Sequence, residues 1–117
     1  MGAPVAWFEI SSKDPGKAAK FYGKLFDWKI SEGPTPDYSM VDTGGGDEAV
    51  NGGIGKQGPD DPGGITVYVK VDNLKTYLAR AEKLGGRTIL PPTDLPGDYG
   101  AFALLADPDG NTVGLWA

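Results

Sequence analysis

The chain contains no cysteine and no histidine. Without cysteine it has no disulfide framework, no thiol nucleophile and no thiolate metal ligand. Without histidine it lacks the side chain that most often acts as a general base or metal ligand near neutral pH. These absences exclude Ser-His-Asp, Cys-His and histidine–metal mechanisms, so any catalysis has to use carboxylates, lysine, tyrosine or backbone groups.

Basic charge and long apolar runs are also scarce. The 117 residues include 16 acidic and 11 basic side chains, which gives a net charge of −5. Nucleic-acid binders cluster Lys and Arg to follow phosphates, and the basic residues here are scattered. The longest apolar run, residues 101–106, is far shorter than the ~20 residues of a membrane span, and the N-terminus lacks a signal-peptide pattern. We expect a cytoplasmic protein with no nucleic-acid or membrane partner.

The composition is that of one folded domain. Hydrophobic residues make up 39% of the chain, and three Trp, five Tyr and four Phe supply large core side chains. A chain of this length can bury one independent core but not two full ones. The 19 glycines and 10 prolines predict many turns. We therefore expect a single domain over residues 1–117.

Two amphipathic helices are the clearest elements. The first begins with Asp14 as N-cap and Pro15 at the first helical position. Its apolar positions, expected to cover a sheet, are Ala18, Phe21, Tyr22 and Leu25. The second begins at Asp72 or Asn73 and ends at Gly85-Gly86, which suits a left-handed C-cap. Its apolar positions are Leu74, Tyr77, Leu78 and Ala81.

Strand-like runs surround both helices in the same order. They are predicted at residues 5–10, 28–30, 38–41, 49–54, 65–71, 87–90, 101–106 and 112–116. The pattern strand, helix, three strands thus occurs twice, about 58–60 residues apart. Module 1 covers about residues 1–55, a Gly/Pro/Asp-rich linker residues 55–64, and module 2 about residues 65–117. We predict an α+β fold of two tandem βαβββ modules that form a half-barrel with the helices outside.

Three local motifs have ordinary structural explanations. Residues 107–111, Asp-Pro-Asp-Gly-Asn, predict a hairpin turn rather than a calcium loop, because no Glu follows at the twelfth position. Residues 53–58 match G-x-G-x-x-G, but they run into Pro59-Asp-Asp-Pro62, which cannot open a phosphate-binding helix. The acidic middle of the chain favours a solvated loop over a cation site, and residues 42–64 are a candidate lid. The acidic residues are Asp37, Asp42, Asp47, Glu48, Asp60 and Asp61.

Side-chain alternation predicts a second, inner face of the sheet. Phe8 and Ile10 should face the helices, whereas Trp7 and Glu9 should face away from them. The candidate ligand-binding residues on this inner face are Trp7, Glu9, Thr66, Tyr68, Lys70, Phe102 and Trp116. Two interpretations stay open: the aromatic residues fill space between half-sheets or in a subunit interface while Glu9 pairs with Lys70, or they line a small-molecule pocket with charged groups.

The sequence resembles the vicinal-oxygen-chelate proteins, which include glyoxalase I, bleomycin-resistance proteins and extradiol dioxygenases. The resemblance lies in residues 5–30, in residues 67–86, in Pro91-Pro92-Thr93 and in the closing DPDGNTVGLW. It covers essentially the whole chain and implies a glyoxalase-like domain. Proteins of this size in the family pair their modules across a two-fold axis, so the resemblance also implies a homodimer.

The family's enzymes usually hold a divalent metal through His, Glu or Gln at four equivalent strand positions. In this chain the resemblance places Trp7 at the first position and Thr66 or Val67 at its module 2 equivalent. The carboxylate that normally follows the DPDGN hairpin is replaced by Gly114, and its module 1 counterpart falls at Gly52 or Gly53. None of these is a good metal ligand. We therefore expect no metal, no cofactor and no metal-dependent glyoxalase or dioxygenase reaction.

The leading hypothesis is a metal-free protein that binds and sequesters a small molecule, as the bleomycin-resistance branch does. The ligand is expected to be aromatic or cationic, because the chain is acidic and Trp7 and Trp116 offer stacking surfaces. One alternative is a metal-independent isomerase- or lyase-like enzyme, with Glu9 as general base and Tyr68 or Lys70 polarising a carbonyl. Another is a structural or regulatory dimer whose cavity is filled by its own side chains.

Overall fold

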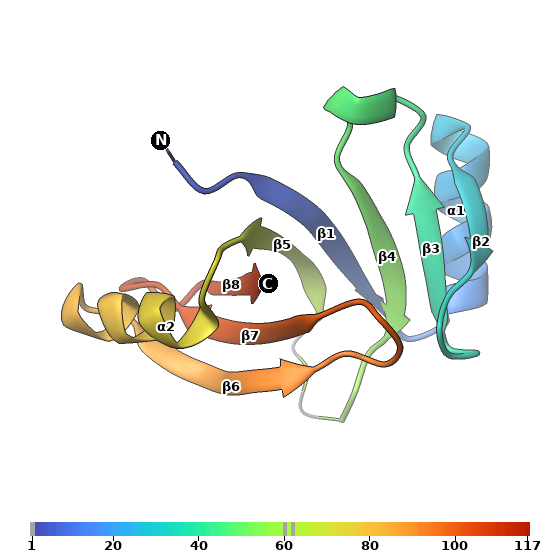
Figure 1. The fold of residues 1–117 in the computed structure, drawn as a ribbon. Coiled ribbons are helices and arrows are strands. Elements are labelled where there is room, and N and C mark those ends of the chain that lie inside the picture. Colours follow the sequence, from blue (N-terminus) through green and yellow to red (C-terminus); the bar gives the residue numbers. More distant parts are fainter. Residues whose placement is uncertain (1, 60, 62) are drawn as a thin grey trace. The chain divides into compact units, whose positions relative to one another are not determined.

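The computed structural model describes residues 2–59, 61 and 63–117 and contains both predicted modules (Figure 1). Module 1 consists of β1 (Val5–Ser12), α1 (Pro15–Phe26), β2 (Lys29–Glu32), β3 (Tyr38–Asp42), the short 3-10 helix η1 (Gly46–Glu48) and β4 (Asn51–Lys56). Module 2 consists of β5 (Gly64–Lys70), α2 (Leu74–Lys83), β6 (Arg87–Asp94), β7 (Ala101–Ala106) and β8 (Thr112–Trp116). The predicted α+β class and the two βαβββ modules are confirmed.

The chain divides into two compact units that nearly coincide with the modules. The first unit is residues 7–65, and the second joins the N-terminal residues up to Ala6 to residues 66–117. In the first unit the strand order is β2-β3-β4-β1, and in the second it is β5-β8-β7-β6. Each unit has one parallel pair, β1 with β4 and β5 with β8, and its other pairs are antiparallel. The two units therefore repeat one topology.

The core of the first unit lies between α1 and its strands, which lie beside each other in Figure 1. Ile10, Val41 and Ile54 are buried there, and half-buried side chains of β1, α1 and the segment before β2 pack around them. These half-buried side chains are Phe8, Ala18, Ala19, Tyr22, Trp28 and Ile30. Phe8 and Ile10 thus face the helix, as the alternation in β1 predicts.

Two apolar positions of α1 differ from the prediction. Phe21 and Leu25 were expected to cover the sheet, but they are 59% and 58% exposed. The helix packs on the sheet through Ala18, Ala19 and Tyr22. These three positions occupy one side of the helix, because residues three and four apart share a side. Phe21 and Leu25 flank that side and remain outside the core.

The core of the second unit is built in the same way around α2. Val71, Leu74, Leu78, Ala103 and Leu115 are buried in one cluster. The N-cap is Asn73 rather than Asp72, since the Asn73 side chain accepts a hydrogen bond from the backbone N–H of Thr76 at 3.0 Å. Gly85 has φ of +100°, so the predicted left-handed end of this helix is confirmed.

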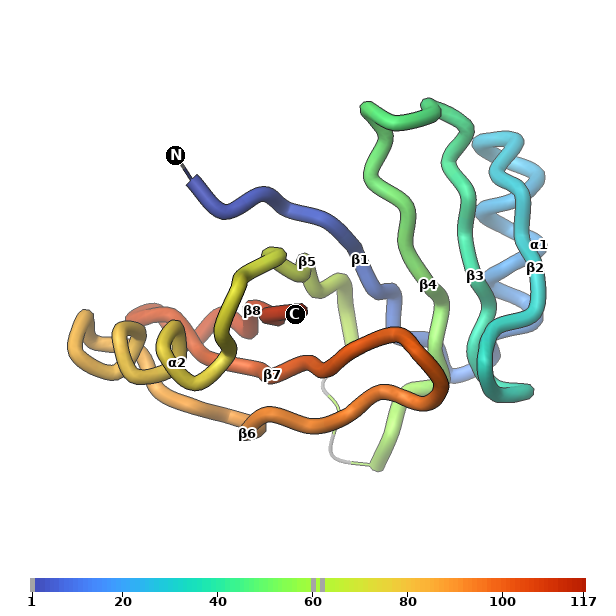
Figure 2. Tube along the Cα trace, in the orientation of Figure 1, coloured from blue at the N-terminus to red at the C-terminus, as the bar shows by residue number. Residues whose placement is uncertain are grey.

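Strand β6 is longer than the predicted residues 87–90. It runs from Arg87 to Asp94 and includes Pro91 and Pro92, which carry no backbone N–H. Figure 2 shows its trace beside that of β7. This strand lies at the end of the strand order and its pairing with β7 shifts register twice. An edge position and irregular pairing are where a strand tolerates proline.

The motif predictions for turns are confirmed. Asp107 accepts hydrogen bonds from the backbone N–H groups of Asp109 and Asn111 and from the Asn111 amide, which closes the turn between β7 and β8. These hydrogen bonds lower the pKa of the Asp107 carboxyl. Most of the G-x-G-x-x-G match lies in strand β4 and opens no helix.

The candidate lid over residues 42–64 is not one continuous loop. Its first part is a turn held by two hydrogen bonds. The Thr43 backbone N–H and the Thr43 hydroxyl both donate to the Asn51 side chain, at 3.0 and 3.1 Å. Strand β4 then occupies much of the remainder. Asp60 of the acidic stretch lies outside the described residues. In the part of the chain that is described, no helix has the length and apolar character needed to cross a membrane.

Candidate functional site

Strand β1 places Trp7 and Glu9 on the face opposite to α1. Glu9 pairs with Gly53 of β4, and Gly53 in turn pairs with Met40 of β3. Trp7, Glu9 and Gly53 therefore share the inner face of the first unit, whereas Phe8 on the other face joins the core. The predicted facing of Trp7 and Glu9 is confirmed.

A chain of hydrogen bonds joins Trp7 to Glu9 through Tyr38, the first residue of β3. The indole Nε1–H of Trp7 donates to the Tyr38 hydroxyl at 3.1 Å. The Tyr38 hydroxyl donates to Oε2 of Glu9 at 3.2 Å. All three side chains are half-buried. Tyr38 was not among the predicted site residues. The available signal was the alternation in β3, which puts Tyr38 on the face opposite to the buried Val41.

The ring of Tyr38 fits only because residue 53 has no side chain. A Cβ atom on Gly53 would overlap the hydroxyl and ring carbons of Tyr38. A Cβ on the neighbouring Gly52 would instead meet Phe8, on the core side. The position that shares a face with Trp7 and Glu9 is therefore Gly53, and Tyr38 fills the space that its side chain would take.

Glu9 carries a charge that its surroundings disfavour. Burial raises the pKa of the Glu9 carboxyl above its ordinary value, because a half-buried carboxylate loses hydration. The hydrogen bond from Tyr38 opposes this effect, and the charge of Asp61 adds to it. Asp61 is held nearby by a hydrogen bond of 3.0 Å from the Ser11 hydroxyl, two residues along β1 from Glu9. The inner face of β1 thus combines an indole, a phenol and two carboxylates.

The second unit repeats the tyrosine-over-glycine arrangement. Tyr68 of β5 pairs with Gly114 of β8, and a Cβ on Gly114 would overlap the Tyr68 ring. Tyr68 is 8% exposed, and its ring centre lies 6.4 Å from that of Phe102. The half-buried Thr66 belongs to the same strand. Each unit therefore has a tyrosine ring where the family resemblance expects a metal-ligating side chain.

Lys70 and Trp116, two further predicted residues of this unit, also contact each other. The Lys70 ammonium lies 4.7 Å from the centre of the Trp116 ring, a cation–π distance. The Trp116 indole N–H donates to the Tyr99 carbonyl at 2.7 Å. The structure thus joins Trp7 with Glu9 in the first unit, and it joins Tyr68 with Phe102 and Lys70 with Trp116 in the second.

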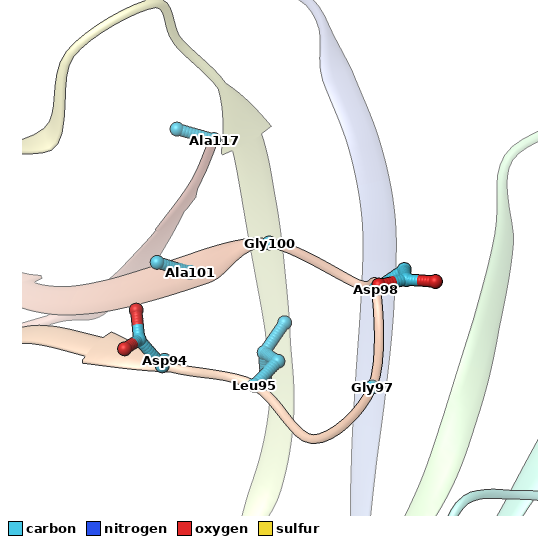
Figure 3. Close-up of a pocket in the computed structure, with 7 residues that line it drawn as sticks. All are labelled: Asp94, Leu95, Gly97, Asp98, Gly100, Ala101 and Ala117. Atoms are coloured by element: carbon cyan, nitrogen blue, oxygen red, sulfur yellow. The ribbon is translucent and has the colours of Figure 1, made fainter.

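A pocket of about 630 Å³ lies beside this region of the second unit, around the connection from β6 to β7 (Figure 3). It is lined by Asp94, Leu95, Gly97, Asp98, Gly100, Ala101 and Ala117. Its two carboxylates, Asp94 and Asp98, are exposed, and in Figure 3 Asp94 lies at the end of β6 and Asp98 on the loop that follows it. None of the predicted ligand-binding residues lines it, so we do not assign it as the site.

The residues present do not fit the divalent metal of the fold family. The indole nitrogen of Trp7 is a hydrogen-bond donor with no free lone pair, and Gly53 and Gly114 offer no side chain. Within the described residues, no group of three or more His, Cys, Asp or Glu side chains could hold a metal ion. The spaces at both glycines are taken by tyrosine rings.

The sequence profile of the Glyoxalase/Bleomycin resistance protein/Dioxygenase superfamily matches residues 5–115 of the chain. The chain belongs to this superfamily. A solved member of the superfamily from Vibrio splendidus has a similar fold, with a TM-score of 0.65 over 97% of both chains at 14% identity. The predicted family is confirmed, and it fixes the fold more closely than the chemistry, since one fold hosts many activities.

Two longer relatives of this superfamily member have names that refer to function. CFP32 of Mycobacterium bovis, named as a glyoxylase, is 33% identical over 94% of this chain and 44% of its own length. DnrV of Streptomyces peucetius, named as an anthracycline biosynthesis protein, is 31% identical over 98% of this chain and 46% of its own length. The chain therefore spans less than half the length of these relatives.

Adding a methyl group at residue 53 should destabilise the fold. We expect Gly53→Ala to lower the free energy of unfolding by roughly 1–3 kcal/mol, because Tyr38 has to move. Urea denaturation measures this loss. Gly58→Ala is the matched control, since nothing lies within 4 Å of the added atom. Combining Gly53→Ala with Tyr38→Ala should recover part of the loss, and strictly additive effects would contradict the packing described above.

Replacing Glu9 should stabilise the protein in a pH-dependent way. The raised pKa means that the folded state binds the proton more tightly than the unfolded chain, so ionisation above the ordinary pKa of 4.5 favours unfolding. We expect Glu9→Gln to raise Tm near pH 7 and to have little effect near about pH 4, where the carboxyl is protonated in both states. The exposed Glu32→Gln is the control. An equal change in Tm at both pH values would contradict the role of ionisation.

Proposed function

We propose that the chain is a small-molecule-binding protein that works without a bound metal ion. Its ligand-contacting surface is the inner face of the first unit, with Trp7, Tyr38 and Glu9. Within the second unit, Tyr68, Lys70, Phe102 and Trp116 form a separate candidate surface. The observation that carries the proposal is the pair of tyrosine rings over Gly53 and Gly114, which occupy the space of two metal-ligating side chains.

The chemistry of these side chains supports an aromatic or cationic ligand. Trp7 and Tyr38 offer ring surface beside a carboxylate, and small-molecule sites commonly combine aromatic walls with a few polar groups. A half-buried carboxylate next to a second acid gains from a cationic partner. Two relatives are named for anthracycline biosynthesis. Daunorubicin, an anthracycline that joins a planar ring system to an amine, is therefore a suitable first probe.

A second candidate function is metal-independent proton transfer. Burial raises the pKa of Glu9, which suits a carboxylate that acts as a general base. Tyr38, rather than the Tyr68 or Lys70 of the sequence hypothesis, is the hydrogen-bond donor beside it. In such a reaction Glu9 takes a proton from carbon next to a carbonyl and returns it to another position. Exchange of ligand hydrogen for solvent deuterium separates this function from binding alone.

Thermal shift measurements test metal and ligand binding together. We expect Mn²⁺, Ni²⁺ or Zn²⁺ to leave Tm unchanged, and daunorubicin to raise it, because a ligand that binds only the native state stabilises it. Elemental analysis of protein purified without chelators should find far less than one metal atom per chain. Stoichiometric metal would contradict the metal-free proposal.

Two variants locate the daunorubicin site. Trp7→Ala should abolish the rise in Tm, since it removes the indole next to Tyr38. The control is Leu84→Ala, which changes an 80% exposed side chain that is not part of the proposed surface. Loss of the shift in both variants, or in neither, would show that the ligand surface is misplaced.

We also propose that the chain assembles as a homodimer through α1. Phe21, Leu25 and Phe26 are 59%, 58% and 53% exposed on this helix, next to Lys17 and Lys24. Residues 13–29 contain five lysines and two aspartates, although the whole chain has a charge of −5. An apolar, basic helix on an acidic protein complements the acidic surface of a second copy.

Sedimentation velocity tests this assembly. We expect Leu25→Gln to weaken self-association markedly, because it removes apolar surface at the centre of the exposed helix face. The matched control, Leu84→Gln, changes an even more exposed leucine of the other unit. Higher salt should also weaken the dimer, since the attraction is partly electrostatic. A monomer at all concentrations would contradict the proposal.

A further inference from the structure

We propose that Tyr38 is the positioning residue of the site: it holds one oxygen of Glu9 and leaves the other to accept a hydrogen bond from a protonated amine of the ligand. This inference rests on the proposed function and names the class of ligand group that the inner face recognises. Tyr38 is hydrogen-bonded to both predicted site residues of β1, Trp7 and Glu9.

The direction of the hydrogen bonds is fixed by the donors. An indole N–H can only donate, so the Tyr38 oxygen has to accept from Trp7. The proton of the Tyr38 hydroxyl is then available to Glu9, and the carboxylate accepts it at Oε2. Donation in the same direction along the chain makes each hydrogen bond stronger than it would be alone. Glu9 is therefore the terminal acceptor of the chain.

The second oxygen of Glu9 is the group that a ligand can reach. Within the described part of the chain, the bond from Tyr38 is the hydrogen bond that the Glu9 carboxylate accepts, and it uses Oε2. An ionised carboxylate has acceptor sites on both oxygens. Oε1 therefore remains for a donor, and a donor that also carries a positive charge forms the stronger bond.

Charge around Glu9 selects a cation over a neutral donor. Among the described residues, a charged group that acts on Glu9 is Asp61, another carboxylate, which accepts hydrogen bonds from the Ser11 hydroxyl and from the backbone N–H of Gly63. Two acids on one face repel each other, and an ammonium group bound between them relieves that repulsion. The rings of Trp7 and Tyr38 add apolar surface for the body of the same ligand.

Tyr38→Phe removes the hydroxyl and keeps the ring over Gly53, so it changes the hydrogen bond without opening a cavity. The chain has four glutamates, Glu9, Glu32, Glu48 and Glu82, which makes a carboxyl ¹³C NMR titration with labelled glutamate simple to assign. We expect Tyr38→Phe to raise the pKa of Glu9 further, since the lost hydrogen bond favours the ionised form. Tyr99→Phe, at a half-exposed tyrosine of the second unit, is the matched control.

Daunorubicin binding supplies the second readout. In the native protein, affinity should fall as the pH drops through the pKa of Glu9, and in Tyr38→Phe the same fall should occur at higher pH. A neutral anthraquinone should show no such dependence. An unchanged pKa of Glu9 in Tyr38→Phe overturns the positioning role, whatever the ligand. If the native protein does not bind daunorubicin, the proposed ligand class fails, and the titration still decides the role of Tyr38.

Discussion

The inner face of the first unit depends on one steric constraint, the absence of a side chain at Gly53. Because nothing extends from that residue, the phenol of Tyr38 can lie across β4 and reach both Trp7 and Glu9. Any side chain there would push the ring away and break the hydrogen bonds that join the indole to the carboxylate. The polar chemistry of this face thus begins with a glycine, and the second unit shows the same relation between Gly114 and Tyr68.

The inner face of this chain carries glycines and tyrosine rings at positions where the resemblance expects metal ligands. A member of this superfamily can therefore keep the fold while the chemistry of its inner face differs. A metal site needs several ligating side chains in fixed geometry. Here the positions that the resemblance assigns to ligands hold an indole, a hydroxyl and bare backbone, and aromatic rings fill the vacated volume. Packing on the helix side is unaffected, because alternate residues of each strand point to opposite faces.

Much of the fold was predictable from the sequence because it rests on local signals. The caps at Asp14 and Asn73 and the period-two alternation in β1 depend on near neighbours in the chain. The exposure of Phe21 and Leu25 was not predictable in this way. Helical spacing identifies the apolar side of a helix, but it does not show which part of that side contacts the sheet. Small residues such as Ala18 set this contact, because they let the helix lie close to the strands.

The candidate site was predictable only in part. Alternation placed Trp7 and Glu9 on the inner face, and it placed Tyr68 and Lys70 on one face of β5. Tyr38 was missed because its role depends on the register of β3 against β4, which pairs Tyr38 with Gly55 and lets its ring lie over Gly53. The local sequence pattern of each strand does not show which residue of a neighbouring strand it pairs with. The length of β6 was missed for a related reason, since Pro91 and Pro92 normally end a strand and only an edge position tolerates them.

The tyrosine-over-glycine pairs make it hard for single substitutions to introduce a metal-ligating side chain at either glycine. Introducing a carboxylate at residue 53 first produces a collision with Tyr38, and removing Tyr38 first leaves Trp7 and Glu9 without their common partner. Whichever of the two substitutions comes first, the single variant is less stable than the present protein. In the second unit, a side chain at Gly114 likewise collides with Tyr68. A ligating side chain at either glycine therefore requires a simultaneous change at the tyrosine that lies over it.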